Sequence, residues 1–174
     1  MEQDLHLLVA GNFSPALGHK QILNALSFYQ KKFSKLINLH FSKPFDKGFC
    51  VYEEEVFSLI KRLGLSSSVH FYTPTPSSST KRLGQADALI YVDCSLLADD
   101  IIQAQAMGLP TVNISSSCNK EKHLATANLI DKCLFDPVFR NKLTVNGYRN
   151  IADNFSHKRI EQVFLSHILT TQHP

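Results

Sequence analysis

Short apolar segments alternate along this chain with longer segments whose apolar residues recur at helical spacing, and this alternation restricts the folds open to it. Most of the short segments are rich in β-branched or aromatic residues, and each is followed by turn residues. The five segments lie at residues 5–11, 36–41, 69–74, 88–93 and 110–115. Apolar runs of this kind are typical of strands that are buried on both faces of a parallel sheet.

The segments that follow these strands predict helices, because their apolar residues recur every three or four positions. The first begins at His19, and the later ones are bounded by glycines that can end a helix. Helices are expected from His19, through residues 56–63 up to Gly64, as a short turn before Gly84, over 96–107 up to Gly108, and over about 119–133. Two closing helices are expected within about 136–170, one opening near Asp136 and Pro137 and one after Ser156, with the polar stretch 73–80 left as a loop.

Parallel strands need crossover connections, and helical crossovers cover both faces of the sheet. The pattern therefore predicts an α/β fold, a three-layer, Rossmann-like, doubly wound parallel sheet, and residues 1–174 are of a length that suits one domain. Ligands of such sheets bind beyond the carboxyl ends of the strands. The informative loops are expected at 11–19, 42–51, 73–80, 93–99 and 115–119.

Composition excludes several classes of function. The formal net charge of +3 is small and evenly spread, which argues against a nucleic-acid partner. No apolar run approaches the roughly 18 to 20 residues of a membrane-spanning helix, and no basic leader opens the sequence, so a cytoplasmic protein is expected. The four cysteines form no CxxC pair and the eight histidines show no zinc-binding spacing, so no metal site is predicted.

Three parts of the chain, in order, resemble the C-terminal, donor-binding domain of retaining glycosyltransferases of the large family 4, which have the GT-B fold. AGNFSPALGHKQILNAL (10–26) is similar to the family's first strand, its Gly-Arg loop and the Ser-Pro-x-Lys-Gly-His that opens a helix. The segment from residue 60 to QAQAMGLPTVNIS (103–115) is similar to the family's Leu-Gly-Leu, Ala-Asp strand and Glu-Ala-Met-Ala-x-Gly-x-Pro segment. Residues 135–168 are similar to its closing helices.

The resemblance covers nearly the whole chain and implies one half of a GT-B enzyme. It also implies a UDP-sugar or GDP-sugar as ligand and, because a GT-B enzyme closes two such domains around its substrates, an N-terminal acceptor half or a partner glycosyltransferase chain. No further cofactor is implied.

The family's donor site depends on charged residues that this sequence replaces. The matched positions near the first strand are Gly11, Asn12, Leu17, Gly18 and His19, where Asn12 stands for the family's Arg and Leu17 for its Lys. Each charge-assisted hydrogen bond to a diphosphate contributes about 1.5 to 3 kcal/mol, so losing both would cost roughly 3 to 6 kcal/mol.

The family's two glutamates are replaced as well. Counting back from Gly108, the second falls on Gln103 and the first on about Ser95. Asp99 and Asp100 lie in the expected first turn of the following helix, where carboxylates would satisfy the helix N-terminus and repel a diphosphate. The anion site is therefore expected to be occupied by the protein itself.

Other residues of these loops have two interpretations each. Lys20 is a candidate compensating cation or a solvated helix lysine, and His19 is a donor contact or a helix N-terminal residue. Ser14 and the serines at 115–117 can donate to a phosphate or form turns, and Asp87 suits a structural role before the fourth strand.

Two functions remain open, and no catalytic residue is assigned in either. One is the donor half of a retaining glycosyltransferase, without independent transferase activity. The alternative is a non-catalytic structural or interaction module, derived from a glycosyltransferase, that pairs with another chain.

Overall fold

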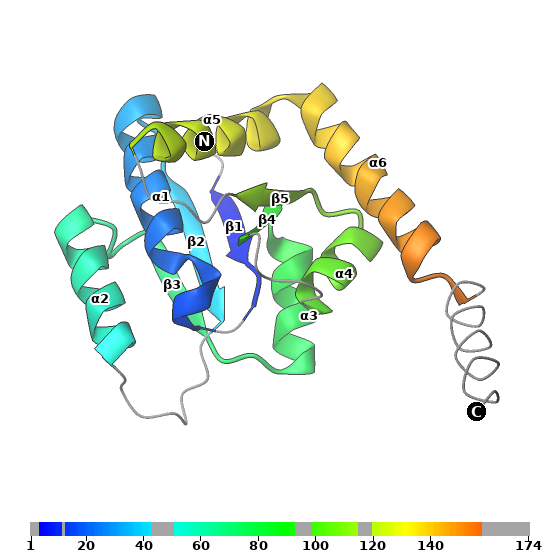
Figure 1. Cartoon of the computed structure of the whole chain (residues 1–174), viewed down its shortest axis with the longest axis horizontal. Coiled ribbons are helices and arrows are strands. Elements are labelled where there is room, and N and C mark those ends of the chain that lie inside the picture. The colour runs from blue at the N-terminus through cyan, green and yellow to red at the C-terminus, as the bar shows by residue number, and fades with distance from the viewer. Residues whose placement is uncertain (1–3, 12, 43–50, 93–98, 115–119, 158–174) are drawn as a thin grey trace, which may run out of the picture.

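The structure is a computed structural model, and it describes residues 4–11, 13–42, 51–92, 99–114 and 120–157. One parallel sheet of five strands runs through it in the order β3-β2-β1-β4-β5 (Figure 1). The strands are β1 Leu5–Val9, β2 Ile37–Ser42, β3 Val69–Tyr72, β4 Ala88–Val92 and β5 Thr111–Ile114. The helices are the 3-10 turn η1 Pro15–Leu17, α1 His19–Phe33, α2 Val51–Leu63, α3 Pro76–Gln85, α4 Asp99–Ala106, α5 Lys120–Phe135 and α6 Pro137–Asn154. The predicted Rossmann-like α/β sheet is confirmed.

Strand pairing sorts the side chains onto two faces of the sheet. Leu7 of β1 pairs with Leu39 and Ala88, whereas its neighbour Leu8 pairs with His40 and Leu89. Because successive side chains of a strand point to opposite faces, the two registers belong to opposite layers.

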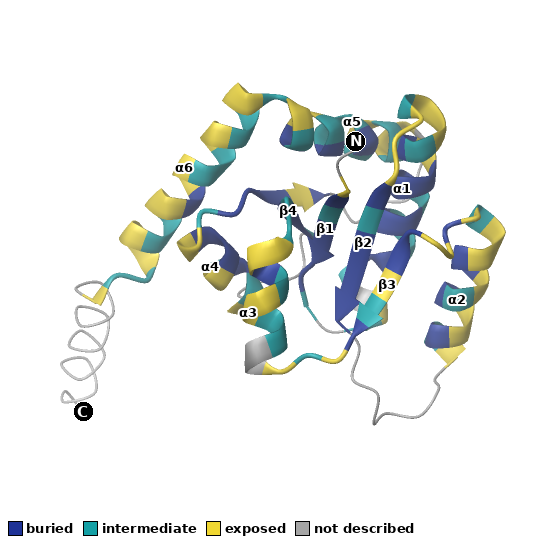
Figure 2. Ribbon diagram, turned by 180° about the vertical axis from the view of Figure 1, so that it is seen from behind, coloured by how far each residue is buried: buried dark blue, intermediate teal, exposed yellow. Residues whose placement is uncertain are grey.

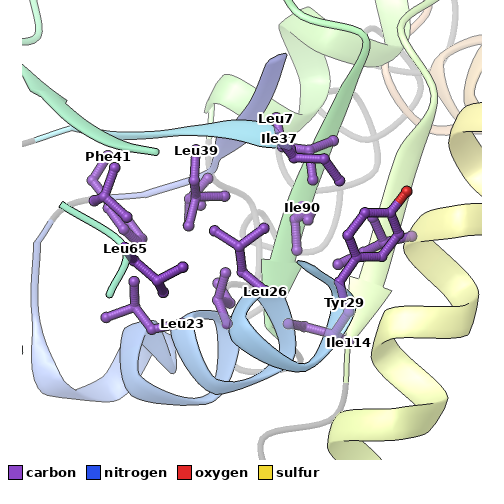
Figure 3. Packing of buried hydrophobic residues seen from close by; sticks show 14 of the residues in the cluster. Leu7, Leu23, Leu26, Tyr29, Ile37, Leu39, Phe41, Leu65, Ile90 and Ile114 are labelled. Carbon is purple, nitrogen blue, oxygen red and sulfur yellow. The ribbon is translucent and has the colours of Figure 1, made fainter. Parts of the chain in front are cut away.

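The first face is covered by α1, α2 and α5 and carries the larger part of the core. Leu23, Leu26 and Tyr29 of α1 pack against Leu39 and Ile90 of the sheet (Figure 3). All five side chains are fully buried, which is the arrangement that the helical spacing after His19 predicts.

The second face is covered by α3 and α4 and has a smaller apolar cluster. Leu8 and Leu89 of the sheet pack there with Leu83 of α3 and Ala104 of α4. Figure 2 shows β2 and β3 in front on this side, with no described helix between them and the viewer. The strand residues at this edge include histidines, so this part of the face is polar.

The last described helix, α6, extends from α5 and packs on α4. The second closing helix, predicted after Ser156, lies outside the described residues. The side chain of Asp136 accepts hydrogen bonds from the backbone amides of Val138 and Phe139, each at 3.0 Å, so the predicted start of this helix is confirmed. Gly147 faces Gln105, and a Cβ atom added to that glycine would lie 3.1 Å from the Gln105 Cγ. A small residue is needed there because α4 and α6 approach closely.

The helix α3 is longer than predicted, since residues 76–80, expected in a loop, are helical. Thr75 and Ser78 form a reciprocal capping box, and Pro76 occupies the first helical position, where its missing N–H costs nothing. The helix also continues through Gly84, where it was expected to stop. The capping residues outweigh the low helix propensity of this polar segment. Within the described part of the chain, no helix combines the length and the apolarity needed to cross a membrane.

Candidate functional site at the carboxyl ends of the strands

Gly11 lies just beyond β1 and has a left-handed backbone with φ of 90°. A Cβ atom on this glycine would lie 2.6 Å from the Cδ1 of Leu17. The leucine side chain therefore packs directly over the Gly11 backbone. An apolar group stands where the resemblance places a lysine.

The backbone amide of Gly11 donates a hydrogen bond to the Oδ2 of Asp100 at 3.2 Å. Asp100 belongs to the first turn of α4, so this contact joins the loop after β1 to α4. The sequence predicts that this carboxylate occupies an anion site at its own helix N-terminus. Its described contact is with Gly11 of the neighbouring loop. Residues 93–98, which precede α4, lie outside the described residues, so the occupation of its own helix N-terminus stays a prediction.

Gly18 and His19 contact neighbouring elements of the fold. Gly18 has φ of 62°, and a Cβ atom there would lie 2.7 Å from a methyl group of Val92 at the end of β4. The His19 Nδ1 lies 2.9 Å from the Tyr52 hydroxyl of α2, and the ring of Phe13 stacks on the imidazole. These contacts fix the loop between β1 and α1 to the neighbouring elements.

Burial keeps His19 neutral. Only 1% of the residue is exposed, and this desolvation lowers the pKa of the imidazole from 6.5 to about 4, against the opposing effect of a hydrogen bond to the backbone of Ser14. A neutral histidine supplies no charge to a phosphate. Its part in donor binding stays a prediction, beside the structural role that its contacts describe.

Lys20, the candidate compensating cation, forms an ion pair with Glu55 of α2 and lies 5.5 Å from the centre of the Tyr52 ring. Its described charge partner is a carboxylate on the outer side of α1 and α2. A role toward phosphate would require the lysine to leave this pair.

Gln103 is exposed and lines a groove of about 590 Å³ between the first half of α3 and the length of α4 from Asp99 to Ala106. The groove is also lined by Thr75, Ser79, Asp99 and Asp100. A ligand in this groove would meet hydroxyl groups on one side and two carboxylates on the other. The arrangement suits hydroxyl groups better than phosphates.

Some of the predicted site residues, namely Asn12, Ser95 and the serines at 115–117, lie outside the described residues. The Asp87 carboxylate accepts the His6 backbone amide at 2.8 Å, which is the structural role expected for it. No group of three or more metal-binding side chains is arranged around one point in the described ranges.

Sequence reasoning missed Gln105, which is buried and joins three elements. Its side chain donates to the Thr111 hydroxyl at 3.2 Å and accepts from Asn150 of α6 at 2.7 Å. Gln105 follows Ala104 on the buried side of α4, and this position could have indicated that the glutamine is buried. A buried glutamine needs hydrogen-bond partners on neighbouring elements. The contact between Asp100 and Gly11 had no such signal, since the two residues lie far apart in the sequence.

Solved structures share this fold. The C-terminal domain of a group 1 glycosyltransferase from Francisella tularensis superposes with a TM-score of 0.67 at 13% identity, covering 88% of this chain and 87% of that domain. The structure of HepE of Anabaena in complex with UDP-glucose gives a TM-score of 0.76 at 16% identity, covering 97% of this chain and 49% of that protein. The pneumococcal O-GlcNAc transferase GtfA, in complex with UDP and GlcNAc, gives 0.71 at 13% identity, with 98% and 36% covered.

These likenesses confirm the predicted architecture, that of the C-terminal half of a group 1 GT-B glycosyltransferase. The chain spans 49% and 36% of the lengths of HepE and GtfA. No model of a protein family and no curated protein sequence matches it.

Proposed function

We propose that this chain is a glycosyltransferase-related domain, built like the donor half of a GT-B enzyme, that transfers no sugar by itself. The observation that carries the proposal is the hydrogen bond from the Gly11 amide to the Asp100 carboxylate. A backbone amide at this edge of the sheet is the kind of donor that a diphosphate uses, and here a carboxylate of the same chain uses it.

A UDP-sugar or GDP-sugar would have to displace Asp100 or bind beside it. Two negative charges 4 Å apart repel by about 4 kcal/mol at the effective dielectric constant of a protein surface. Asp99, adjacent in the same helical turn and exposed, adds to this repulsion. The free energy available to hold a diphosphate at this edge is correspondingly reduced.

The side chains at and next to the family-matched positions after β1 do not offset this repulsion. Leu17 packs on Gly11 without charge, His19 is neutral, and Lys20 pairs with Glu55. A donor half would need a cation here to stabilise the leaving diphosphate in the transition state. The charge balance therefore favours a domain without independent transferase activity.

The second candidate is an interaction module that pairs with another chain, either an acceptor half or a partner glycosyltransferase. Its support is the fold, since this chain matches one part, 49% and 36%, of HepE and GtfA, whose solved structures hold UDP-glucose or UDP with GlcNAc. In such a complex the domain would supply one wall of the crevice. The carboxylates of Asp99 and Asp100, which line the groove around Gln103, would then contact hydroxyl groups of the sugar donor.

Calorimetric titration with UDP, GDP, UDP-glucose and GDP-mannose tests the proposal. The unmodified chain is expected to bind none of them more tightly than millimolar. Asp100→Ala frees the Gly11 amide and removes a charge, so binding of the diphosphates should strengthen by at least about tenfold. Asp100→Asn keeps an acceptor for Gly11 and removes only the charge, so its gain should be smaller.

Asp99→Ala is the matched control, because it removes the same charge from the same turn without freeing the Gly11 amide. Equal gains in Asp99→Ala and Asp100→Ala would reduce the effect to general electrostatics. Micromolar binding by the unmodified chain, or sugar transfer by it alone, would contradict the proposal.

A further inference from the structure

A second pocket lies on the α3 side of the sheet, away from the crevice around Gly11 and Asp100 at the carboxyl ends of the strands. It has a volume of about 320 Å³ and is lined by His6, Leu8, His40, Arg82, Gln85 and Ala86, and we refer to it as the His6–Arg82 pocket. It lies toward the amino end of β1, because α3 ends at Gln85 and His6 is the second residue of that strand. At a rise of about 3.3 Å per residue, His6 is roughly 16 Å from Gly11.

Two histidines of this pocket are hydrogen-bonded to one another. The Nδ1 of His6 lies 2.9 Å from the Nε2 of His40, so one of these nitrogens carries a proton and the other accepts it. His40 is only 7% exposed, and its Nδ1 is buried with no hydrogen-bond partner among the described residues. An N–H without an acceptor is the costlier arrangement, which favours the proton on Nε2 of His40 and leaves the Nε2–H of His6 as a free donor.

Arg82 brings a full positive charge to the same pocket. Its guanidinium lies 5.6 Å from the centre of the Tyr72 ring, and no carboxylate of the described residues lies within ion-pair distance of it. None of the lining residues is acidic. The neighbouring carboxylate, Asp87, is engaged by the His6 backbone amide.

The end of α3 contributes a partial charge of opposite sign. A helix C-terminus is equivalent to about −0.5 elementary charge, whereas the guanidinium in the last turn carries a full positive one. Among the residues that line the pocket, Arg82 is the only arginine, lysine or carboxylate. The pocket offers the donors of Arg82, His6 and the Gln85 amide over an apolar floor of Leu8 and Ala86.

We propose that the His6–Arg82 pocket binds a small oxyanion, a carboxylate or a phosphate group, between the Arg82 guanidinium and the His6 imidazole. A planar guanidinium presents paired N–H groups that match two oxygens of such an anion. A cation is disfavoured by Arg82. A metal ion is disfavoured as well, since the described histidines form no group of three suited to hold one.

The pKa shifts of two histidines agree in direction with the positive charge of Arg82 near this pocket. The pKa of His40 is lowered from 6.5 to about 4 by burial and then by the positive charges of His70, Arg82 and His6. The pKa of His70, on the neighbouring strand, is lowered by burial and then by His6 and Arg82. An anion beside Arg82 would offset the repulsion that contributes to both shifts.

Titration with inorganic phosphate and, separately, with acetate tests the proposal, followed by nuclear magnetic resonance of the histidine ring signals. Saturable shifts of the His6 and His40 signals are expected with at least one of the two anions, together with a higher pKa for His40. Comparison of the two titrations shows whether the pocket prefers a phosphate or a carboxylate.

Arg82→Gln is expected to lower the affinity for the anion at least tenfold. Lys81→Gln removes the neighbouring exposed charge of α3 and should leave this affinity unchanged. Arg82→Lys keeps the charge without the planar fork, so this variant is expected to bind the anion with intermediate affinity. It serves as the test if Arg82→Gln unfolds the protein. No saturable shift with either anion, or equal weakening in Arg82→Gln and Lys81→Gln, would overturn the proposal. The outcome does not depend on whether the crevice binds a nucleotide.

Discussion

The two faces of the sheet differ in how completely helices cover them. The first face has α1, α2 and α5 over an almost entirely apolar cluster. The second face has α3 and α4 over a smaller cluster, and its strand residues toward β3 include His40, His70 and Asn38. Both unusual polar features, the contact between Asp100 and Gly11 and the His6–Arg82 pocket, involve elements of the second face. The comparison indicates that stability resides mainly on one face and polar chemistry on the other.

The largest expected effect is the loss of a core leucine from the first face. Leu26→Ala removes a side chain that is 1% exposed and packed between α1 and the sheet, so the free energy of unfolding should fall by about 2 to 5 kcal/mol. Leu83→Ala makes the same change on the second face, beside the thinner cluster, and should cost less because its surroundings can collapse. Urea denaturation of both variants measures the difference. A larger cost for Leu83→Ala would break the comparison.

The next effect concerns pH, because each face holds one buried histidine. The pKa values of His19 and His40 are lowered from 6.5 to about 4, so between these pH values the unfolded state binds more protons. Stability is therefore complete above about pH 6.5 and is lost as the pH falls toward 4, by on the order of 3 kcal/mol for a histidine as buried as His19. Urea denaturation at a series of pH values measures this loss.

Replacing each histidine separately assigns the pH effect to a face. His19→Phe should flatten the pH dependence more than His40→Leu, because His40 lies beside an open pocket where water can reach its neighbours. The His19 variant keeps the stack with Phe13 and loses the contact with Tyr52, so its stability at pH 7 provides the baseline. An unchanged pH profile in His19→Phe would contradict a neutral His19 in the folded state.

The smallest expected effect belongs to an ion pair at the surface of the first face. Lys20 and Glu55 have side chains that are 40% and 52% exposed, so Lys20→Gln should lower the free energy of unfolding by only about 0.5 kcal/mol. The effect should vanish at about 1 M salt, where charges are screened within roughly 3 Å. Affinity for UDP should not change. A large loss of UDP affinity would instead identify Lys20 as the compensating cation.

Local signals were sufficient for most of the fold. The start of α6 at Asp136 and the left-handed ends at Gly64 and Gly108 follow from residues that cap or end helices. The start of α3 was missed because the capping pair of Thr75 and Ser78 lies in a segment whose composition resembles a loop. Two or three residues decide where a helix is capped, and the overall composition of a segment does not reveal them.

The candidate site could be predicted only in part. The sequence placed Gly11 and Leu17 after the first strand and Asp100 at the start of the helix that follows the fourth strand, where the structure has them. The replacement of donor-site charges there stays a prediction. The sequence did not pair Asp100 with the Gly11 amide, which lies 89 residues away in the chain. The pairing depends on the position of β1 beside β4, and strand order is not encoded in any local pattern.

The order of apolar runs and turn residues by itself determined a parallel α/β sheet, because alternating strands and helices can bury their apolar surfaces in few other ways. Only the tertiary structure decided which polar groups meet: Asp100 with Gly11, Gln105 with Asn150, and His6 with His40. Burial is nondirectional and can be read from hydrophobic spacing, whereas a hydrogen bond needs two atoms at about 3 Å, which distant segments reach only after the chain has folded.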